Sequence, residues 1–254
     1  VEFQFADFVT ESFKMIVDFA GGNHYRKMGP VPIVLRLPSA SLTSAGPFHS
    51  QNPEPWFFST PGLKIVAPTT AYDAKGMMKT AIRDNNPVLF LEYKKFYNYP
   101  IDELPKVLRP DIPDEDYTVP FGEARILREG DDLSLITFGT TVLEALDAAD
   151  ILESDGVQVE VIDMRTIFPF DKDAILNSAR KTGKLLILHE ARKRGGVAGE
   201  FASIVAEEAF EFLDAPIRRV GAIDTPVPMS PPLEKAYLPG TEMVVDAPRD
   251  LAAY

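Results

Sequence analysis

The chain contains no cysteine among its 254 residues, and this absence removes several chemistries at once. Disulfide frameworks, thiolate metal sites, iron–sulfur clusters and cysteine nucleophiles all require this residue. A chain of this length buries a core large enough to fold without disulfides, as one large domain or two ordinary ones. The absence of cysteine is also typical of proteins that work in a reducing compartment.

Basic residues are scarce relative to acidic ones. The chain has 26 lysines and arginines against 38 aspartates and glutamates, and its formal net charge is −12. Nucleic-acid surfaces neutralise phosphates with basic side chains, so this acidity argues against a nucleic-acid partner. No apolar run approaches the roughly eighteen residues of a membrane helix, and no secretory signal pattern begins the chain. The sequence therefore predicts a soluble intracellular protein.

Proline is in excess, with 22 residues. Its densest stretch is residues 100–121, where it alternates with acidic residues. Interior helices and central strands exclude such a composition. We therefore expect a linker at residues 100–121, between a first domain at residues 1–99 and a second at residues 122–254. The prolines of this stretch are Pro100, Pro105, Pro110, Pro113 and Pro120.

Apolar β-branched runs alternate with helical patterns along the chain. The clearest helical spacing runs from Ala74 to Ile82, with Thr70 as N-cap. Phe3 and Phe5 alternate at the start, as in a strand with two rings on one face. Strands separated by single helices favour parallel pairing, so the predicted class is α/β, with parallel sheets covered on both faces. The other expected strands are Val31–Leu37, Lys64–Ala67, Val88–Leu91, Leu133–Phe138, Val157–Ile162, Lys184–Leu188 and Ile217–Val220, and the other helices lie at residues 13–20, 142–149, 171–180 and 197–213.

Histidine is rare, with three residues, and the context of His49 suggests chemistry. This residue lies in a loop of small residues and prolines at residues 44–53, beside an expected strand. Such loops bind ligands in α/β proteins, and an imidazole there can transfer a proton near neutral pH. A surface histidine that bonds its own loop explains the pattern equally well. For His189, which ends a buried run, a structural hydrogen bond is the favoured role, and His24 is expected in a loop.

Two other segments carry weaker chemical signals. Residues 192–200 contain glycines before a helix, where backbone amides can receive an anion, but their spacing matches neither common phosphate motif. Glycines that bring the helix close to the sheet are the favoured explanation. Where the Ala74–Ile82 helix ends, free carbonyls combine with oxygens of Asp84 and Asn86 and could coordinate a hard cation. Helix termination before Pro87 accounts for the same residues.

Seven segments, taken in order across nearly the whole chain, indicate a known protein family: Phe3–Phe8, His49–Glu54, Thr60–Lys64, Tyr72–Gly76, Ala81–Pro87, Glu160–Thr166 and Phe212–Pro216. Each is weak alone, but the set is highly specific. Together they resemble the beta subunit of the thiamine-diphosphate-dependent decarboxylating component of 2-oxo acid dehydrogenase complexes. The resemblance implies a transketolase-like α/β fold, with an incomplete pyrimidine-binding domain on a parallel sheet followed by a C-terminal α/β domain.

The resemblance also implies an activity and partners. The chain would be an enzyme subunit for oxidative decarboxylation of a 2-oxo acid, pyruvate or branched-chain, and for reductive acylation of a lipoyl group. It would form an alpha-two, beta-two heterotetramer in the cytoplasm, or in the mitochondrial matrix of a eukaryote. Thiamine diphosphate would lie between alpha and beta subunits, with its diphosphate and Mg²⁺ held by the alpha subunit. The charge of −12 suits docking of a basic segment of the lipoyl-bearing acyltransferase core.

Individual residues match positions of known role in that family. Phe5 matches the ring that packs on the aminopyrimidine, in a cofactor-binding segment that includes Gln4. His49 matches the active-site histidine, which is expected to stabilise charge on the substrate-derived intermediate and to serve acyl transfer. A structural K⁺ site is matched by Ile33, Ala81, Ile82, Asp84 and Asn86.

One family feature is missing. In this family a glutamate upstream of the Phe5 position hydrogen-bonds the aminopyrimidine, whereas here only four residues precede Phe5 and Glu2 lies on the wrong side of the motif. We therefore expect the N-terminal part of the first domain to be absent, which leaves an open apolar face at Val1, Phe3 and Phe5. The alternative is a non-catalytic docking module derived from this subunit, and an upstream Gly-Glu-Asp-like turn would argue against it. The poor glycine fingerprint disfavours a nucleotide-binding oxidoreductase.

Overall fold

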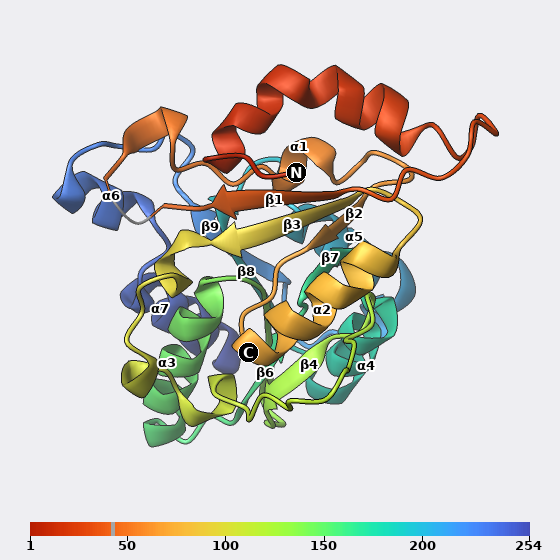
Figure 1. The fold of residues 1–254 in the computed structure, drawn as a ribbon. Coiled ribbons are helices and arrows are strands. Elements are labelled where there is room, and N and C mark those ends of the chain that lie inside the picture. The colour runs from red at the N-terminus through yellow and green to blue at the C-terminus, as the bar shows by residue number, and fades with distance from the viewer. Residues whose placement is uncertain (42–43) are drawn as a thin grey trace. The chain divides into compact units, whose positions relative to one another are not determined.

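The computed structural model describes residues 1–41 and 44–254, which form two compact units (Figure 1). Two late segments of the chain belong to the first unit, so neither unit is continuous in sequence. The stretch at residues 100–121 also belongs to the first unit. The division into domains at residues 1–99 and 122–254 with a linker between them stays a prediction. The first unit comprises Val1–Gly122, Arg165–Phe170 and Pro226–Glu234, and the second comprises Glu123–Met164, Asp171–Thr225 and Lys235–Tyr254.

The first unit is built on a four-stranded sheet with the order β1-β3-β2-β7. Strands β1 (Val34–Ser39) and β2 (Lys64–Val66) run parallel to β3 (Val88–Tyr93), and all three confirm predicted strands. Strand β7 (Thr166–Phe168) pairs antiparallel with β2. The sequence did not predict β7, and its direction shows that the expectation of purely parallel pairing is wrong at this edge.

Helix α2 (Ala71–Arg83) confirms both the predicted helix and its N-cap. The Oγ1 of Thr70 accepts a hydrogen bond from the amide of Asp73 at 3.0 Å, which satisfies one of the free amides of the first turn. Figure 1 shows α2 lying along the sheet of the first unit. Its buried side chains, Met77 and Ala81, join a core cluster with Val66, Val88, Phe90 and Val119.

The start of the chain differs from the predicted strand. Glu2 forms an isolated bridge with Arg36 of β1, and the amide of Phe3 donates to the carbonyl of Arg36 at 3.1 Å. A 3₁₀ helix, η1 (Ala6–Ser12), begins directly after Phe5, so the strand prediction is wrong beyond this bridge. A π-helix replaces the α-helix expected at residues 13–20. The remaining helices of this unit are η2 (Met15–Gly21, the π-helix), α1 (Glu54–Phe57), and the single turns η3 (Gly46–Phe48), η4 (Lys94–Phe96), η5 (Ile101–Glu103) and η6 (Lys106–Leu108).

The second unit contains a five-stranded sheet with the order β4-β6-β5-β8-β9. The pairings of β5 with β6, β5 with β8 and β8 with β9 are parallel, as predicted, whereas the unpredicted β4 lies antiparallel to β6. Strands β5 (Leu133–Thr137) and β6 (Val159–Asp163) are buried throughout, as expected of strands covered on both faces. The other elements are β4 (Arg125–Arg128), α3 (Thr141–Ser154), α4 (Lys172–Thr182), β8 (Leu185–Arg192), α5 (Ala198–Glu208), η7 (Phe210–Phe212), β9 (Arg218–Ala222) and α7 (Thr241–Ala252), and α6 (Pro231–Tyr237) is divided between the units.

Both units have the α/β architecture that the alternation of strands and helices predicts. In the second unit, α3 packs with α7 and α4 packs with α5. Most strand pairs are parallel, and the antiparallel strands β4 and β7 each lie at a sheet edge. Within residues 1–41 and 44–254, no helix combines the length and the apolar character that a membrane crossing requires.

Candidate functional site

Three rings of the first unit form an aromatic cluster: Phe5, Phe8 and His49. The ring centroids of Phe5 and His49 lie 4.7 Å apart at an interplanar angle of 88°, and those of Phe8 and His49 lie 5.5 Å apart at 74°. The two phenylalanine rings contact each other edge to face at 5.8 Å. Aromatic contacts of this kind stabilise by about 0.5–1.5 kcal/mol each beyond their burial. The fold therefore brings together Phe5 and His49, two site residues predicted from distant segments.

The loop that carries His49 is attached to η1 and to the end of β1. The amide of Gln51 donates to the carboxylate of buried Asp7, in η1, at 3.3 Å. The carbonyl of Gln51 accepts a hydrogen bond from the amide of Ala40, just after β1, at 3.2 Å. The first bond holds the loop against the segment that carries the two phenylalanines, and the second holds it against the end of β1.

A late segment of the first unit, Pro226–Glu234, also contacts this loop. The amide and the hydroxyl of Ser44 both donate to the carboxylate of Glu234, at 2.9 and 3.0 Å. Gly46 has a φ of +73°, and a Cβ there would lie 2.5 Å from Cγ of Met229. Glycine alone tolerates both the backbone angle and this close approach. Sequence reasoning missed these contacts because no local pattern links such distant residues.

Lys94 lies beside the aromatic cluster and was also missed. It begins η4 directly after the buried strand β3, and it is 7% exposed. Its ammonium donates a hydrogen bond to the carbonyl of His49 and lies 5.1 Å from the centre of the Phe5 ring. The available signal was a lysine pair, Lys94 and Lys95, at the carboxyl end of a parallel strand, where α/β proteins place ligand-binding groups.

These residues offer three complementary chemical groups. His49 contributes a half-buried imidazole, whose ring nitrogens can donate and accept hydrogen bonds. The half-buried ring of Phe5 suits stacking on a planar heteroaromatic ligand. The buried ammonium of Lys94 can stabilise negative charge on a bound ligand. Gln4, also predicted to bind the cofactor, is an exposed neighbour of Phe5. The donor set fits the pyrimidine end of thiamine diphosphate, while the individual roles stay predictions.

The acidic member of the predicted potassium set lies just after α2. The Asp84 carboxylate accepts hydrogen bonds from the amide and side chain of Asn86, at 2.8 and 3.2 Å, and pairs with the ammonium of Lys64. Partial burial raises the pKa of Asp84, but the hydrogen bonds from Lys64 and Asn86 outweigh burial and lower this pKa below its ordinary value. The carboxylate therefore stays charged at neutral pH, with a lysine already beside it.

The carbonyl members of that set lie just before β1 and in the last turn of α2. The carbonyl of Ile33 accepts from the amide of Val88 at 2.9 Å, and the carbonyl of Ala81 accepts from the amide of Asp84 at 3.3 Å. A carbonyl oxygen has a second lone pair, so each of these oxygens can also bind a cation. Ile82 is 65% exposed at the same helix end. An oxygen-only set of this kind fits a hard cation, and K⁺ at this place stays a prediction.

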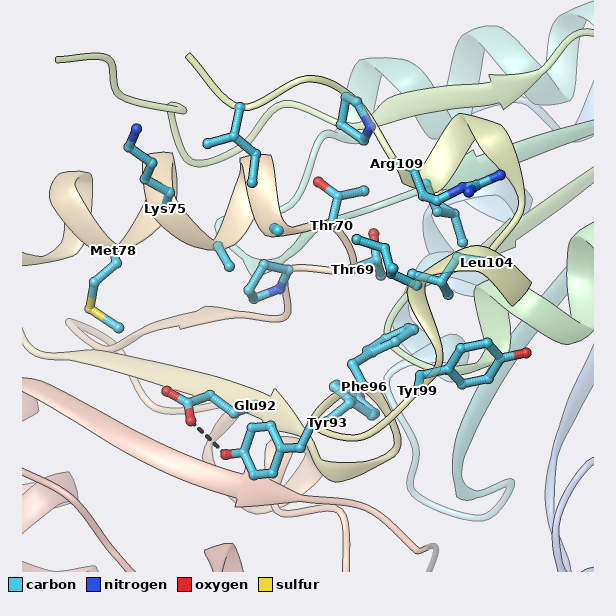
Figure 2. Close-up of a pocket in the computed structure, with 18 of the residues that line it drawn as sticks. Thr69, Thr70, Lys75, Met78, Glu92, Tyr93, Phe96, Tyr99, Leu104 and Arg109 are labelled. Atoms are coloured by element: carbon cyan, nitrogen blue, oxygen red, sulfur yellow. Dashed lines mark hydrogen bonds between the residues drawn. The ribbon is translucent and has the colours of Figure 1, made fainter. Parts of the chain in front are cut away.

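A separate cavity of about 1020 Å³ lies in the first unit, between the start of α2, β3 and residues 96–112. Figure 2 shows Thr69 and Thr70 near Leu104 and Arg109 in its wall. The residues that line it include neither Phe5 nor His49. This cavity therefore lies outside the candidate site.

His189 of β8 is buried in the second unit beside the backbone of Ala191, and its structural hydrogen bond stays a prediction. It is 1% exposed, and neither ring nitrogen has a hydrogen bond of normal geometry within the part of the chain that the structure describes. A Cβ at Gly196 would lie 2.5 Å from its Nε2, and one at Gly221 would lie 3.1 Å from its Cε1. Gly196 therefore makes space for the imidazole of His189. This supports the explanation that the glycines of residues 192–200 allow close packing, rather than the explanation that they bind phosphate.

His189 is expected to make the second unit sensitive to acid. Burial, with a further contribution from the positive charge of Arg219, lowers the pKa of His189 to about 4. In the unfolded chain the imidazole has a pKa of about 6.5, so as the pH falls it is protonated there before it is protonated in the folded protein. The contribution of His189 to the free energy of unfolding is therefore complete above pH ~6.5. It falls by ~3 kcal/mol as the pH drops to ~4. Unfolding of the wild type and of His189→Leu, measured from pH 7.5 to 4.5, should show the smaller loss in the variant. Parallel profiles would contradict this prediction.

Comparison with protein families identifies the class. Residues 1–100 match the transketolase pyrimidine binding domain, and residues 122–244 match the transketolase C-terminal domain. A solved structure described as a split gene transketolase, inactive beta4 tetramer, has a TM-score of 0.74 at 22% identity and covers 98% of this chain and 74% of that chain. That likeness shows the fold alone. The protein is transketolase-like, which confirms the predicted fold.

Curated relatives narrow the class. The 2-oxoisovalerate dehydrogenase subunit beta of Bacillus subtilis (strain 168) is 41% identical over 100% of this chain and 76% of its own length. The pyruvate dehydrogenase E1 component subunit beta of Rickettsia felis is 43% identical over the same shares. The acetoin:2,6-dichlorophenolindophenol oxidoreductase subunit beta of B. subtilis is 40% identical over 98% of this chain and 71% of its own length. The chain belongs to the family of E1 beta subunits of 2-oxo acid dehydrogenases, as its segments predict.

Proposed function

We propose that this chain is the beta subunit of a 2-oxo acid dehydrogenase. With an alpha partner it catalyses thiamine-diphosphate-dependent oxidative decarboxylation of a 2-oxo acid and reductive acylation of a lipoyl group. The observation that carries the proposal is the 4.7 Å contact between the rings of His49 and Phe5, beside a buried lysine. Family membership supports the same reaction class.

Each residue of the site has a distinct task in this proposal. Phe5 stacks on the aminopyrimidine of the cofactor, with Gln4 beside it. Thiamine diphosphate, held with its pyrimidine end at these residues, would supply a nucleophilic carbon and an electron sink for decarboxylation. His49 stabilises negative charge and moves a proton at its ring nitrogen when the acyl group passes to the lipoyl sulfur.

The other components of the reaction come from partners. The alpha subunit, in an alpha-two, beta-two heterotetramer, holds the diphosphate and Mg²⁺. The lipoyl-bearing acyltransferase core docks through a basic segment, which the charge of −12 favours. A structural K⁺ would be held by Asp84, Asn86 and the carbonyls of Ile33, Ala81 and Ile82. The assembly works in the cytoplasm, or in the mitochondrial matrix of a eukaryote.

Turnover by the subunit assembled with its cognate alpha subunit tests the proposal. We expect decarboxylation of pyruvate or 2-oxoisovalerate that requires both the alpha subunit and thiamine diphosphate, measured as reduction of a dye acceptor. The ratio of kcat/KM values for the two acids assigns the substrate. Acetoin serves as a third substrate because one relative is named for it. Turnover of acetoin alone, or of none of the three, would contradict a 2-oxo acid dehydrogenase.

A further inference from the structure

Lys94 joins the two predicted residues of the candidate site. Its ammonium donates a hydrogen bond to the main-chain carbonyl of His49, and it lies 5.1 Å from the centre of the Phe5 ring. The two rings themselves are in edge-to-face contact at 4.7 Å. One side chain therefore contacts the loop of the imidazole and the ring proposed to receive the cofactor.

The burial of Lys94 makes this arrangement informative. Removal of an ammonium from water is expensive unless other groups compensate it, and lysine is among the residues that proteins bury least. Lys94 is 7% exposed, and the carbonyl of His49 and the face of Phe5 both interact favourably with its charge. A lysine that served only packing would be less stable here than an apolar side chain of similar length.

We propose that Lys94 is a positioning residue, whose buried ammonium fixes the His49 loop and the Phe5 ring relative to each other. The proposal rests on the proposed function, because it assigns Lys94 to the groups that carry that reaction. Strand β3 is fixed in the centre of the first sheet, and Lys94 follows its last residue directly. The lysine therefore connects the loop that carries His49 to a central strand of the sheet. Displacement of reacting groups by about 1 Å can lower a rate ~10²-fold.

The histidine NMR spectrum tests this positioning without any turnover. The chain has only three histidines, and the rings of Phe5 and Phe8 shift the signals of the His49 imidazole through their ring currents. Lys94→Met should move the His49 signals, and Lys94→Arg, which keeps a charge and donors, should move them less. The matched control, Lys95→Met, should leave them in place. Unchanged His24 and His189 signals would show that each variant is folded, and an unmoved His49 signal in folded Lys94→Met would overturn the proposal.

Kinetics of the assembled enzyme separate positioning from other roles. We expect Lys94→Met to lower kcat for lipoyl acylation by about tenfold or more, with the KM for the 2-oxo acid within about twofold of wild type. A raised KM with an unchanged kcat would instead assign Lys94 to substrate binding and overturn positioning. Normal kinetics of Lys94→Met, in an enzyme that His49→Ala inactivates, would overturn the inference and leave the proposed function intact. Failure of the wild type on every 2-oxo acid would reject the proposed function, and the NMR result would still decide the role of Lys94.

Discussion

Replacement of His49 by alanine is expected to lower acyl transfer to the lipoyl group by a factor of ~10²–10⁴, the usual contribution of a positioned acid–base side chain. The imidazole is the member of the aromatic cluster whose ring nitrogens can donate and accept hydrogen bonds. The hydrogen bonds described above for its loop, from Ser44, Gln51 and the carbonyl of His49, use no atom of the His49 side chain, so alanine retains them. Assembly with the alpha subunit should therefore be preserved while acyl transfer is lost.

Two assays on one preparation distinguish loss of decarboxylation from loss of acyl transfer. Reduction of a dye acceptor follows decarboxylation, whereas mass spectrometry of a lipoyl domain follows acylation. The matched control is His24→Ala, because His24 is an exposed histidine of the same unit and lies outside the aromatic cluster. We expect wild-type acylation in the control and almost none in His49→Ala. Wild-type acylation by His49→Ala would refute its role in acyl transfer.

The elements that local sequence signals define were predictable. Helix α2 has a threonine cap, apolar residues at helical spacing, and a polar end before a proline, so all of its determinants lie within residues 70–87. The buried strands β5 and β8 likewise appear as short runs rich in leucine and isoleucine. Strands β4 and β7 were missed because they are short and carry no such run, and their pairing depends on neighbours already placed.

The composition of the first unit could not be derived from chain order. Its third segment returns from far along the chain, and the link is made by the carboxylate of Glu234, which accepts two hydrogen bonds from Ser44. Nothing in either local sequence indicates this pair, because long-range contacts leave no periodic pattern. The cluster of Phe5 and His49 was anticipated only through resemblance to a family, since spacing alone left a surface histidine as an equal explanation. Lys94 was missed because charged residues are normally assigned to solvent.

A buried ion pair within the first unit is the basis of the second large effect, which concerns stability. The Oδ1 of Asp73 accepts from Nη1 of Arg165 at 2.8 Å, and the two side chains are 0% and 10% exposed. Asp73→Asn should lower the free energy of unfolding by about 3–5 kcal/mol, because it removes the negative charge that pairs with the buried guanidinium of Arg165. Asparagine keeps the shape of the side chain but has one acceptor oxygen, whereas Asp73 accepts from Thr70 Oγ1 on Oδ2 at 2.6 Å and from Arg165 on Oδ1. The variant therefore removes the charge together with one of the two acceptors.

The single tryptophan, Trp56, lies in α1 of the first unit, so its fluorescence during urea unfolding reports on this unit. The matched control is Asp18→Asn, which breaks a pair with Lys14 whose side chains are 51% and 77% exposed and which should change stability by only ~0.5 kcal/mol. The double variant of Asp73→Asn with Arg165→Met removes both charges, so it should be more stable than Asp73→Asn alone. If Asp73→Asn unfolds at the same urea concentration as the control, the pair does not stabilise the unit. The attachment of residues 165–170 to α2 must then depend on the backbone pairing of β7 with β2.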